Sequence, residues 1–162
     1  MNFIGRKGLK LTHIAGVVLQ LFRAAHAAQD GQHPLRTGGD LAEIRRAEPC
    51  GDLQTEAQAE IENGTQPEIT VDVDSLDEYE VIFVGYPIWW NESPAMISTF
   101  LASCDFDGKA VAPFCTSVYS PIDNSLHIFE KLAPDAILED GLTANDLNDV
   151  EPWLDELGVL AS

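Results

Sequence analysis

Basic side chains are scarce in this chain of 162 residues. Nine lysines and arginines stand against 27 aspartates and glutamates, which gives a formal net charge of −18 at pH 7. Nucleic acids and anionic membrane surfaces attract basic patches, so this balance argues against both as partners. The charge fits a basic protein partner or, more simply, an acidic surface that faces water.

The chain also lacks a paired cysteine pattern and a long apolar run. Its three cysteines, Cys50, Cys104 and Cys115, are odd in number and show no CxxC spacing. A disulfide framework or a metal site is therefore not expected. Reduced thiols fit a reducing compartment, the cytoplasm. No apolar stretch reaches the roughly 18 residues of a membrane span, and neither a P-loop nor a GxGxxG motif occurs.

What the chain does have is the length and apolar content of one globular domain, with 45% hydrophobic residues. Its clearest feature is Tyr79–Trp90, with the sequence YEVIFVGYPIWW. Val81–Val84 is apolar at every position, which predicts a strand buried on both faces, as in a parallel sheet. Gly85 and Pro87 end this strand, and two tryptophans follow at the place where open α/β sheets bind ligands.

Strand-like and helix-like segments alternate from residue 40 to the end of the chain. Further strands are expected at Leu41–Arg45, Lys109–Cys115 and Ala136–Leu138, and helices at Leu53–Ile61, Ala95–Ala102, Asn124–Leu132 and Asp146–Leu157. Helix caps are expected at Ser93 and at Asn124 or Ser125. The alternation predicts an α/β fold in which helices cover both faces of a five-stranded parallel sheet, with strand order 2-1-3-4-5.

Residues 1–36 differ in character from the rest of the chain. Residues 1–46 hold seven basic and three acidic side chains, whereas the remainder holds two basic and 24 acidic ones. In one interpretation, Ile14–Leu19 is the first, central strand and an alanine-rich helix follows it. In another, basic, apolar and small residues up to Ala25-His26-Ala27 form a leader over residues 1–27, and the protein is exported.

From about Thr37 to Leu157, the sequence resembles the flavodoxin-like proteins whose hallmark is a GYPIWW strand end, here Gly85–Trp90. The segments TGGDLAEI at 37–44, FDGKAVAPFCTS at 106–117 and VEPWLDEL at 150–157 add to the resemblance. It implies a flavodoxin-like three-layer sandwich over residues 37–162, FMN as the cofactor, and a redox role in electron transfer or quinone-type reduction. The flavin would carry this chemistry, so no catalytic side chain is assigned.

FMN in such a fold is held by three loops at strand ends. The resemblance implies cofactor-binding residues in two of them: Tyr86, Pro87, Ile88, Trp89, Trp90, Thr116, Ser117, Val118 and Tyr119. The first group would form an aromatic shelf for the flavin ring, or else the tryptophans cap the core. In the second group the family's glycines are replaced, and Tyr119 can stack on the ring, fill the site or pack elsewhere.

The remaining loop, which binds phosphate and is rich in serine, threonine, glycine and asparagine, is not recognisable after Leu19. A shifted reading frame would explain both this and the charge asymmetry. Dropping one base over Leu19–Arg23 allows Tyr-Ser-Phe-Ser, and the same shift over Gln29–His33 allows a plausible first-helix segment. Sequencing the locus in independent reads tests this hypothesis.

Two functions follow from the sequence. The first is an FMN-binding redox protein that meets a redox partner protein or a small-molecule acceptor; in the latter case it is an FMN-dependent oxidoreductase. The alternative is a flavin-free binding or structural domain that has lost its phosphate loop.

Overall fold

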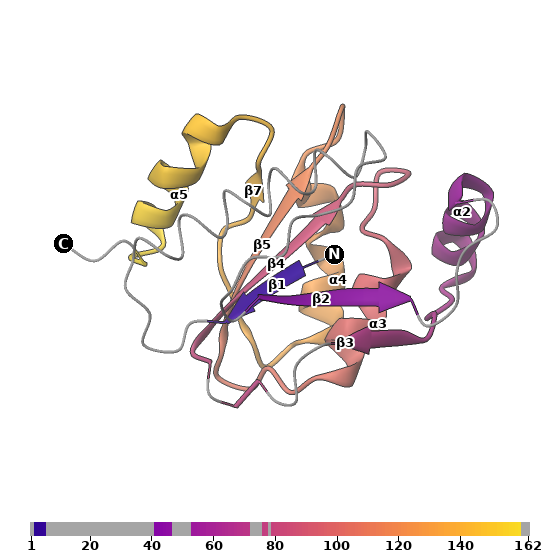
Figure 1. Ribbon diagram of the computed structural model, residues 1–162, viewed down its shortest axis with the longest axis horizontal. Coiled ribbons are helices and arrows are strands. Elements are labelled where there is room, and N and C mark those ends of the chain that lie inside the picture. Colours follow the sequence, from indigo (N-terminus) through magenta and orange to yellow (C-terminus); the bar gives the residue numbers. More distant parts are fainter. Residues whose placement is uncertain (1, 6–40, 47–52, 72–75, 78, 160–162) are drawn as a thin grey trace.

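The computed structural model describes residues 2–5, 41–46, 53–71, 76–77 and 79–159. The strands are β1 (Asn2–Gly5), β2 (Leu41–Arg46), β3 (Ile69–Val71), β4 (Val81–Pro87), β5 (Ala110–Thr116), β6 (Ile137–Leu138) and β7 (Leu142–Thr143). The helices are α2 (Leu53–Asn63), α3 (Ala95–Ser103), α4 (His127–Leu132) and α5 (Val150–Glu156), with single 3-10 turns η1 (Ile122–Ser125) and η2 (Leu147–Asp149). Figure 1 shows α3 and α4 behind the sheet, so the α/β prediction is confirmed.

The described strands form one mixed sheet in the order β3-β2-β1-β4-β5-β6, with β7 also paired to β5. The β4, β5, β6 and β7 pairings are parallel, as expected for βα units. The prediction of five parallel strands is wrong for the other half, because β1 runs antiparallel to β2 and β4, and β3 antiparallel to β2. Strand pairing satisfies backbone hydrogen bonds in either direction, so apolar patterning alone does not fix the direction of a strand.

The strand beside β4 is also not the one expected. Asn2–Gly5 holds the position between β2 and β4, whereas the expected first strand, Ile14–Leu19, lies outside the described residues, as does Gln29–His33. The short edge strand Ile69–Val71 is not among the strands that the sequence predicts.

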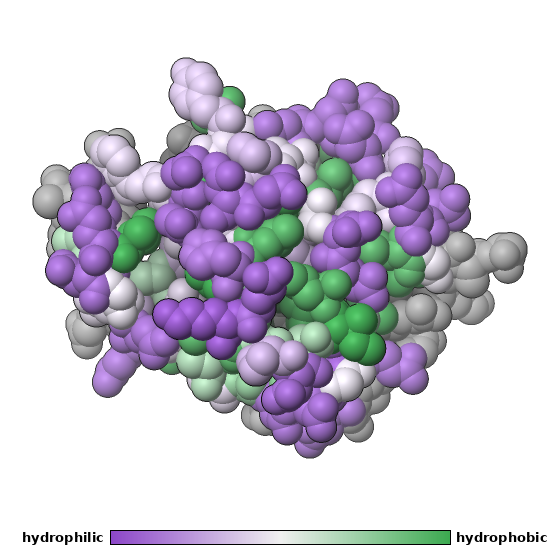
Figure 2. All heavy atoms as spheres, turned by 180° about the vertical axis from the view of Figure 1, so that it is seen from behind, coloured by the Kyte–Doolittle hydropathy of each residue, from purple (hydrophilic) through white to green (hydrophobic). Residues whose placement is uncertain are grey.

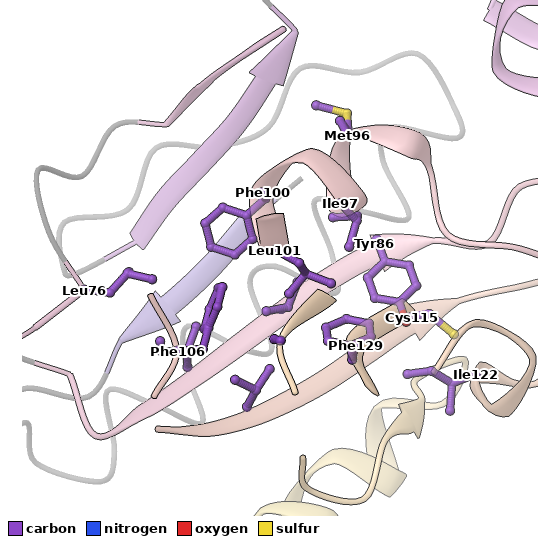
Figure 3. Packing of buried hydrophobic residues seen from close by; sticks show 14 residues of the cluster. Leu76, Tyr86, Met96, Ile97, Phe100, Leu101, Phe106, Cys115, Ile122 and Phe129 are labelled. Atoms are coloured by element: carbon purple, nitrogen blue, oxygen red, sulfur yellow. The ribbon is translucent and has the colours of Figure 1, made fainter. Parts of the chain in front are cut away.

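The central strand β4 is buried on both faces, as its uniform apolar run predicts. Ile82, Val84 and Tyr86 pack with the inner faces of α3 and α4, whereas Phe83 belongs to a second cluster that includes residues of α5. Successive side chains of a strand point to opposite faces, so this division places one helical layer on each side of the sheet. Figure 3 shows Tyr86 and α3 residues such as Phe100 within the first cluster.

The second buried strand, β5, contains a proline without losing its pairing to β4. On the side of β6 and β7, the carbonyls of Lys109, Val111 and Cys115 accept backbone hydrogen bonds. Pro113 belongs to the same alternate series, so its missing N–H faces that side. There β6 has already ended and β7 has not begun, and the proline therefore interrupts no ladder.

The helix ends follow the sequence signals in part. Gly64 adopts φ +63° and closes α2, as expected for a glycine after a helix. Pro94, rather than Ser93, is the capping residue of α3. No side chain caps α4, which begins at His127. Ser125 does not cap because its hydroxyl donates to the Ile122 carbonyl and lies 2.9 Å from the Tyr86 hydroxyl.

The face of the protein opposite to that of Figure 1 is dominated by hydrophilic side chains, with apolar surface showing between them (Figure 2). Within the described part of the chain, no helix has the length and apolar character needed to span a membrane.

Candidate functional site

The two loops singled out in the sequence lie side by side at one edge of the sheet. Tyr86 pairs with Cys115 and Pro87 with Thr116, so β4 and β5 end level with each other. The Ile88 N–H then donates to the Thr116 carbonyl at 2.9 Å. We call these two strand ends and their loops the sheet edge. In open α/β sheets, ligands bind at the carboxyl ends of parallel strands.

The first loop makes a tight turn over Trp89–Glu92, which we call the shelf turn. Trp89 and Glu92 exchange two backbone hydrogen bonds of 2.8 and 2.9 Å. The two central residues, Trp90 and Asn91, adopt φ of +51° and +70°, the conformation of a type I′ turn. Asparagine tolerates this region, but a bulky tryptophan rarely adopts it. Such outliers concentrate at functional sites.

The shelf turn displays one of its two indoles. The side chain of Trp90 is 57% exposed, whereas Trp89 is half-buried. One indole thus lies largely at the surface and gives the sheet edge an exposed aromatic side chain. That side chain is of the kind on which a planar ligand ring stacks.

The second loop is fixed at its start and exposed at its tip. The Ser117 N–H donates to the Asn145 side-chain oxygen at 3.0 Å, and the Ser120 N–H donates to the Ser117 hydroxyl at 2.9 Å. Val118 and Tyr119 are 72% and 95% exposed. The Tyr119 side chain is therefore not packed against the described residues, and its stacking on a ligand stays a prediction.

A buried hydroxyl without a partner belongs to the last residue of β5, where the second loop begins. Thr116 is 2% exposed, and its Oγ1 has no hydrogen-bond partner within the described residues. Buried polar groups in proteins are nearly always hydrogen-bonded, so an orphan of this kind needs an explanation. A polar ligand at the sheet edge would supply the missing partner, and the residues present thus fit a flavin ring with its polar rim.

Tyr86 contributes its backbone, not its ring, to the sheet edge. Its side chain is 2% exposed and stacks on Phe129 with a centroid distance of 6.0 Å. The Ser125 hydroxyl already donates to a backbone carbonyl, so the Tyr86 hydroxyl is the donor in their 2.9 Å contact. Burial raises the pKa of Tyr86 above its ordinary range. Figure 3 shows the ring among the core side chains.

Cys115 also points into the core and is fully buried. Burial raises the pKa of its thiol from 9.0 to about 12, more than the hydrogen bond with Thr143 lowers it. A nucleophilic thiol needs a lowered pKa, so the structure supports Cys115 as a core residue. The described residues contain no group of three or more histidine, cysteine or carboxylate side chains placed to hold a metal ion.

The raised pKa of Cys115 predicts a loss of stability at alkaline pH. The thiol stays protonated in the folded protein up to pH of about 12 but ionises near pH 9 in the unfolded chain. Stability from this group is therefore complete below pH 9 and falls as pH rises, by about 1.4 kcal/mol per unit. Urea unfolding at pH 8 and pH 10 measures the loss. Cys115→Ala should reduce this loss of stability. An unchanged loss in the variant would show that Cys115 is not its source.

Sequence reasoning missed three residues that support the shelf turn: Asn91, Asn124 and His127. The tolerance of asparagine for positive φ is a signal that could have indicated Asn91. Nothing local could have indicated the other two, because they reach the turn from η1 and α4, more than 30 residues away. The expected phosphate loop, after Leu19, lies outside the described residues.

Solved structures with a similar fold include flavoproteins. The crystal structure of a candidate flavoprotein from Bacteroides eggerthii DSM 20697 matches with 29% identity over 91% of each chain and a TM-score of 0.67. One from Bacteroides uniformis ATCC 8492 matches with 31% identity over 70% of this chain and 79% of its own, at a TM-score of 0.61.

A flavoprotein from Lactobacillus acidophilus NCFM, solved in complex with FMN, shares the fold at 22% identity, over 81% of this chain and 88% of that one, with a TM-score of 0.56. No curated protein is significantly similar to the chain. The sequence profile of the flavodoxin family matches residues 34–157, three quarters of the chain, and the protein is therefore a member of the flavodoxin family.

Proposed function

We propose that the protein binds FMN at the sheet edge and acts as a redox protein. The observation that carries the proposal is the buried, unpartnered Oγ1 of Thr116 beside the exposed and strained Trp90. Both lie where a flavodoxin fold binds its ligand, and a structural relative of the same fold holds FMN. Bound FMN would supply the electron-transfer chemistry.

The residues of the sheet edge would bind and orient the flavin. The indole of Trp90 would offer a stacking face and exclude water from the ring, and Tyr119 would offer a second, exposed aromatic side chain from the other loop. The Thr116 hydroxyl would gain a polar partner on the ring. The backbone of Pro87–Ile88 contributes the remaining wall. An electron-transfer partner or a small-molecule acceptor would approach the exposed side of the ring.

The alternative function is a flavin-free binding domain. It is favoured by Val118, whose branched side chain stands in a loop where the resemblance implies glycine. FMN titration of the purified full-length chain decides between the two functions. Binding should quench flavin fluorescence and raise the melting temperature, since a ligand of the folded state stabilises it. If neither effect occurs with FMN in large excess, the FMN proposal is wrong and the flavin-free function is favoured.

Two substitutions should separate flavin binding from folding. Thr116→Val removes an unpartnered buried hydroxyl and is expected to stabilise the flavin-free protein by about 1 kcal/mol. Trp90→Gly removes the strain of a bulky residue at positive φ. It should stabilise the flavin-free protein by at most about 1 kcal/mol. Both should weaken FMN binding, Trp90→Gly by about tenfold or more, since one aromatic stack is worth about 1–3 kcal/mol.

The measurements are chemical unfolding of the flavin-free protein and fluorescence titration with FMN. Ile137→Ala serves as the control, because it truncates a side chain that is 56% exposed on β6, beside the first residue of β5 and at the opposite end of that strand from both loops. Unchanged FMN affinity in both test variants would contradict the proposal that FMN binds at the sheet edge.

A further inference from the structure

The shelf turn cannot be explained by its own residues alone. Trp90 stands in the left-handed region at φ +51°, which disfavours a bulky side chain, and only one pair of backbone hydrogen bonds closes the turn. A conformation of this kind persists when its surroundings over-determine it. The question is therefore which neighbouring groups hold the turn in place.

Two residues outside the turn contact its side chains. Asn124 of η1 donates from Nδ2 to the Asn91 side-chain oxygen at 2.8 Å. His127, the first residue of α4, places Nε2 3.7 Å from the Glu92 carboxylate. The two are themselves joined, since His127 Nδ1 lies 3.0 Å from the Asn124 carbonyl oxygen. Each polar side chain of the shelf turn that follows Trp90 thus has its own partner on the η1–α4 segment.

The protonation state of His127 decides whether this arrangement is attractive. A carbonyl oxygen only accepts hydrogen bonds, so Nδ1 must carry a proton in its contact with Asn124. In the neutral ring, Nε2 would then present a lone pair to the Glu92 carboxylate. In the imidazolium both nitrogens carry protons, and both oxygens are satisfied. Histidine gains this second proton in the mildly acidic range.

Other charged groups lie around the ring. Glu60 of α2 and Lys131 of α4 line, with Glu92 and His127, a hollow of about 270 Å³ between α2, α3 and α4. The face seen in Figure 2 is the one that carries this hollow. Asp123 and Glu130 lie within four residues of His127 on its own segment. Carboxylates outnumber the single ammonium in this set.

We propose that Asn124 and His127 are positioning residues for Trp90, and that protonation of His127 tightens the shelf turn. The indole is then presented in a fixed orientation below neutral pH and is less restrained above it. Where the proposed FMN site is concerned, this rests on the proposed function: affinity for a ring stacked on Trp90 should rise as pH falls. The coupling of the turn to His127 itself requires no flavin.

The first test uses the flavin-free, full-length chain. Proton–nitrogen NMR spectra follow the indole N–H of Trp90, identified by its loss in Trp90→Phe, from pH 8 to pH 5. Its resonance should shift with a single titration in the wild type and stay constant in His127→Gln. Glu92→Gln should abolish the shift as well. The indole of Trp153, buried on the other face, reports whether each variant is folded.

Lys131→Gln is the matched control, because it removes a cation from the same helix and the same hollow without a contact to the shelf turn. It should titrate as the wild type does. A Trp90 shift that persists unchanged in His127→Gln would overturn the inference, as would its loss in Lys131→Gln alone.

The second test adds FMN at pH 8 and pH 5.5. Relative to His127→Gln, the wild type should gain about two- to fivefold in affinity at the lower pH, the factor that an ion pair between partly exposed side chains supplies. The phosphate of FMN titrates in the same range, but it does so equally with every variant. If FMN fails to bind at any pH while the indole still follows His127, the proposed function is wrong and this inference stands.

Discussion

Replacing Trp153 by alanine is expected to lower the free energy of unfolding by about 3–5 kcal/mol, the largest effect that we predict. The side chain is 5% exposed and meets Phe83 edge-on, with ring centroids 5.7 Å apart, and Phe114 at 6.2 Å. Its indole N–H donates to the Asp140 carbonyl at 2.7 Å. Truncation would leave a cavity between α5 and the sheet, and the Asp140 carbonyl would lose its hydrogen-bond donor.

Urea or guanidinium unfolding measures the loss. Trp153→Phe retains an aromatic ring but no indole N–H and should cost roughly 1–2 kcal/mol, about one lost hydrogen bond plus imperfect packing. Trp90→Ala is the matched control, since it deletes the same side chain from an exposed position and should change stability by at most about 0.5 kcal/mol. Equal losses in Trp153→Ala and Trp90→Ala would contradict the docking of α5 on the sheet.

Gly85→Ala is expected to cost about 3 kcal/mol, at the upper end of the range for overpacked cores. Gly85 and Phe114 are paired across β4 and β5, and the Phe114 ring lies over the glycine. A Cβ at position 85 would approach this ring to 2.3 Å. The ring is 2% exposed and wedged against Trp153, so it has no space into which it could turn.

A double-mutant cycle identifies this cause. Phe114→Leu shortens the opposing side chain, so Gly85→Ala should cost much less in the Phe114→Leu background than in the wild type, an interaction of the size found between residues in contact. Gly108→Ala is the control: its φ is +67°, but a Cβ there meets nothing within 4 Å. Its cost, about 1 kcal/mol of backbone strain, should be the same in both backgrounds. Simple additivity for Gly85→Ala would exclude the clash.

The same packing links the core to the sheet edge. Gly85 lies two residues before the end of β4, and Phe114 two residues before the end of β5. Both strands continue directly into the loops that carry Trp90 and Thr116. The GYPIWW motif therefore begins with a glycine that the core requires and ends with a tryptophan that the core does not need.

Local patterning in the sequence was enough for the elements around the site. A run without polar alternation, Val81–Val84, predicted a strand with two buried faces, and the structure confirms it with Phe83 on one side and Ile82 and Val84 on the other. The helix expected at Ala95–Ala102 is present as α3, Ala95–Ser103. The resemblance pointed to the right family because its motifs are spread over residues 37–157, nearly the whole of the stretch that the family profile matches.

Local patterning did not predict which strands pair with each other or in which direction they run. The antiparallel insertion of Asn2–Gly5 beside β4 joins segments almost 80 residues apart. Its four residues carry no periodicity that distinguishes it from a loop or reveals its direction. A proline inside a strand is unusual, and only the break between β6 and β7 shows why Pro113 is tolerated in β5.

By itself, the sequence determined the family, the buried character of β4, and the position of two candidate loops at the carboxyl ends of β4 and β5. The tertiary structure alone decided that Trp90 is displayed at positive φ, that Thr116 keeps an unpartnered hydroxyl, and that His127 reaches the shelf turn. The physical reason is the range of the interactions. Burial and turn propensity are read from neighbours along the chain, whereas strain, orphaned polar atoms and ion pairs arise only between segments that folding brings together.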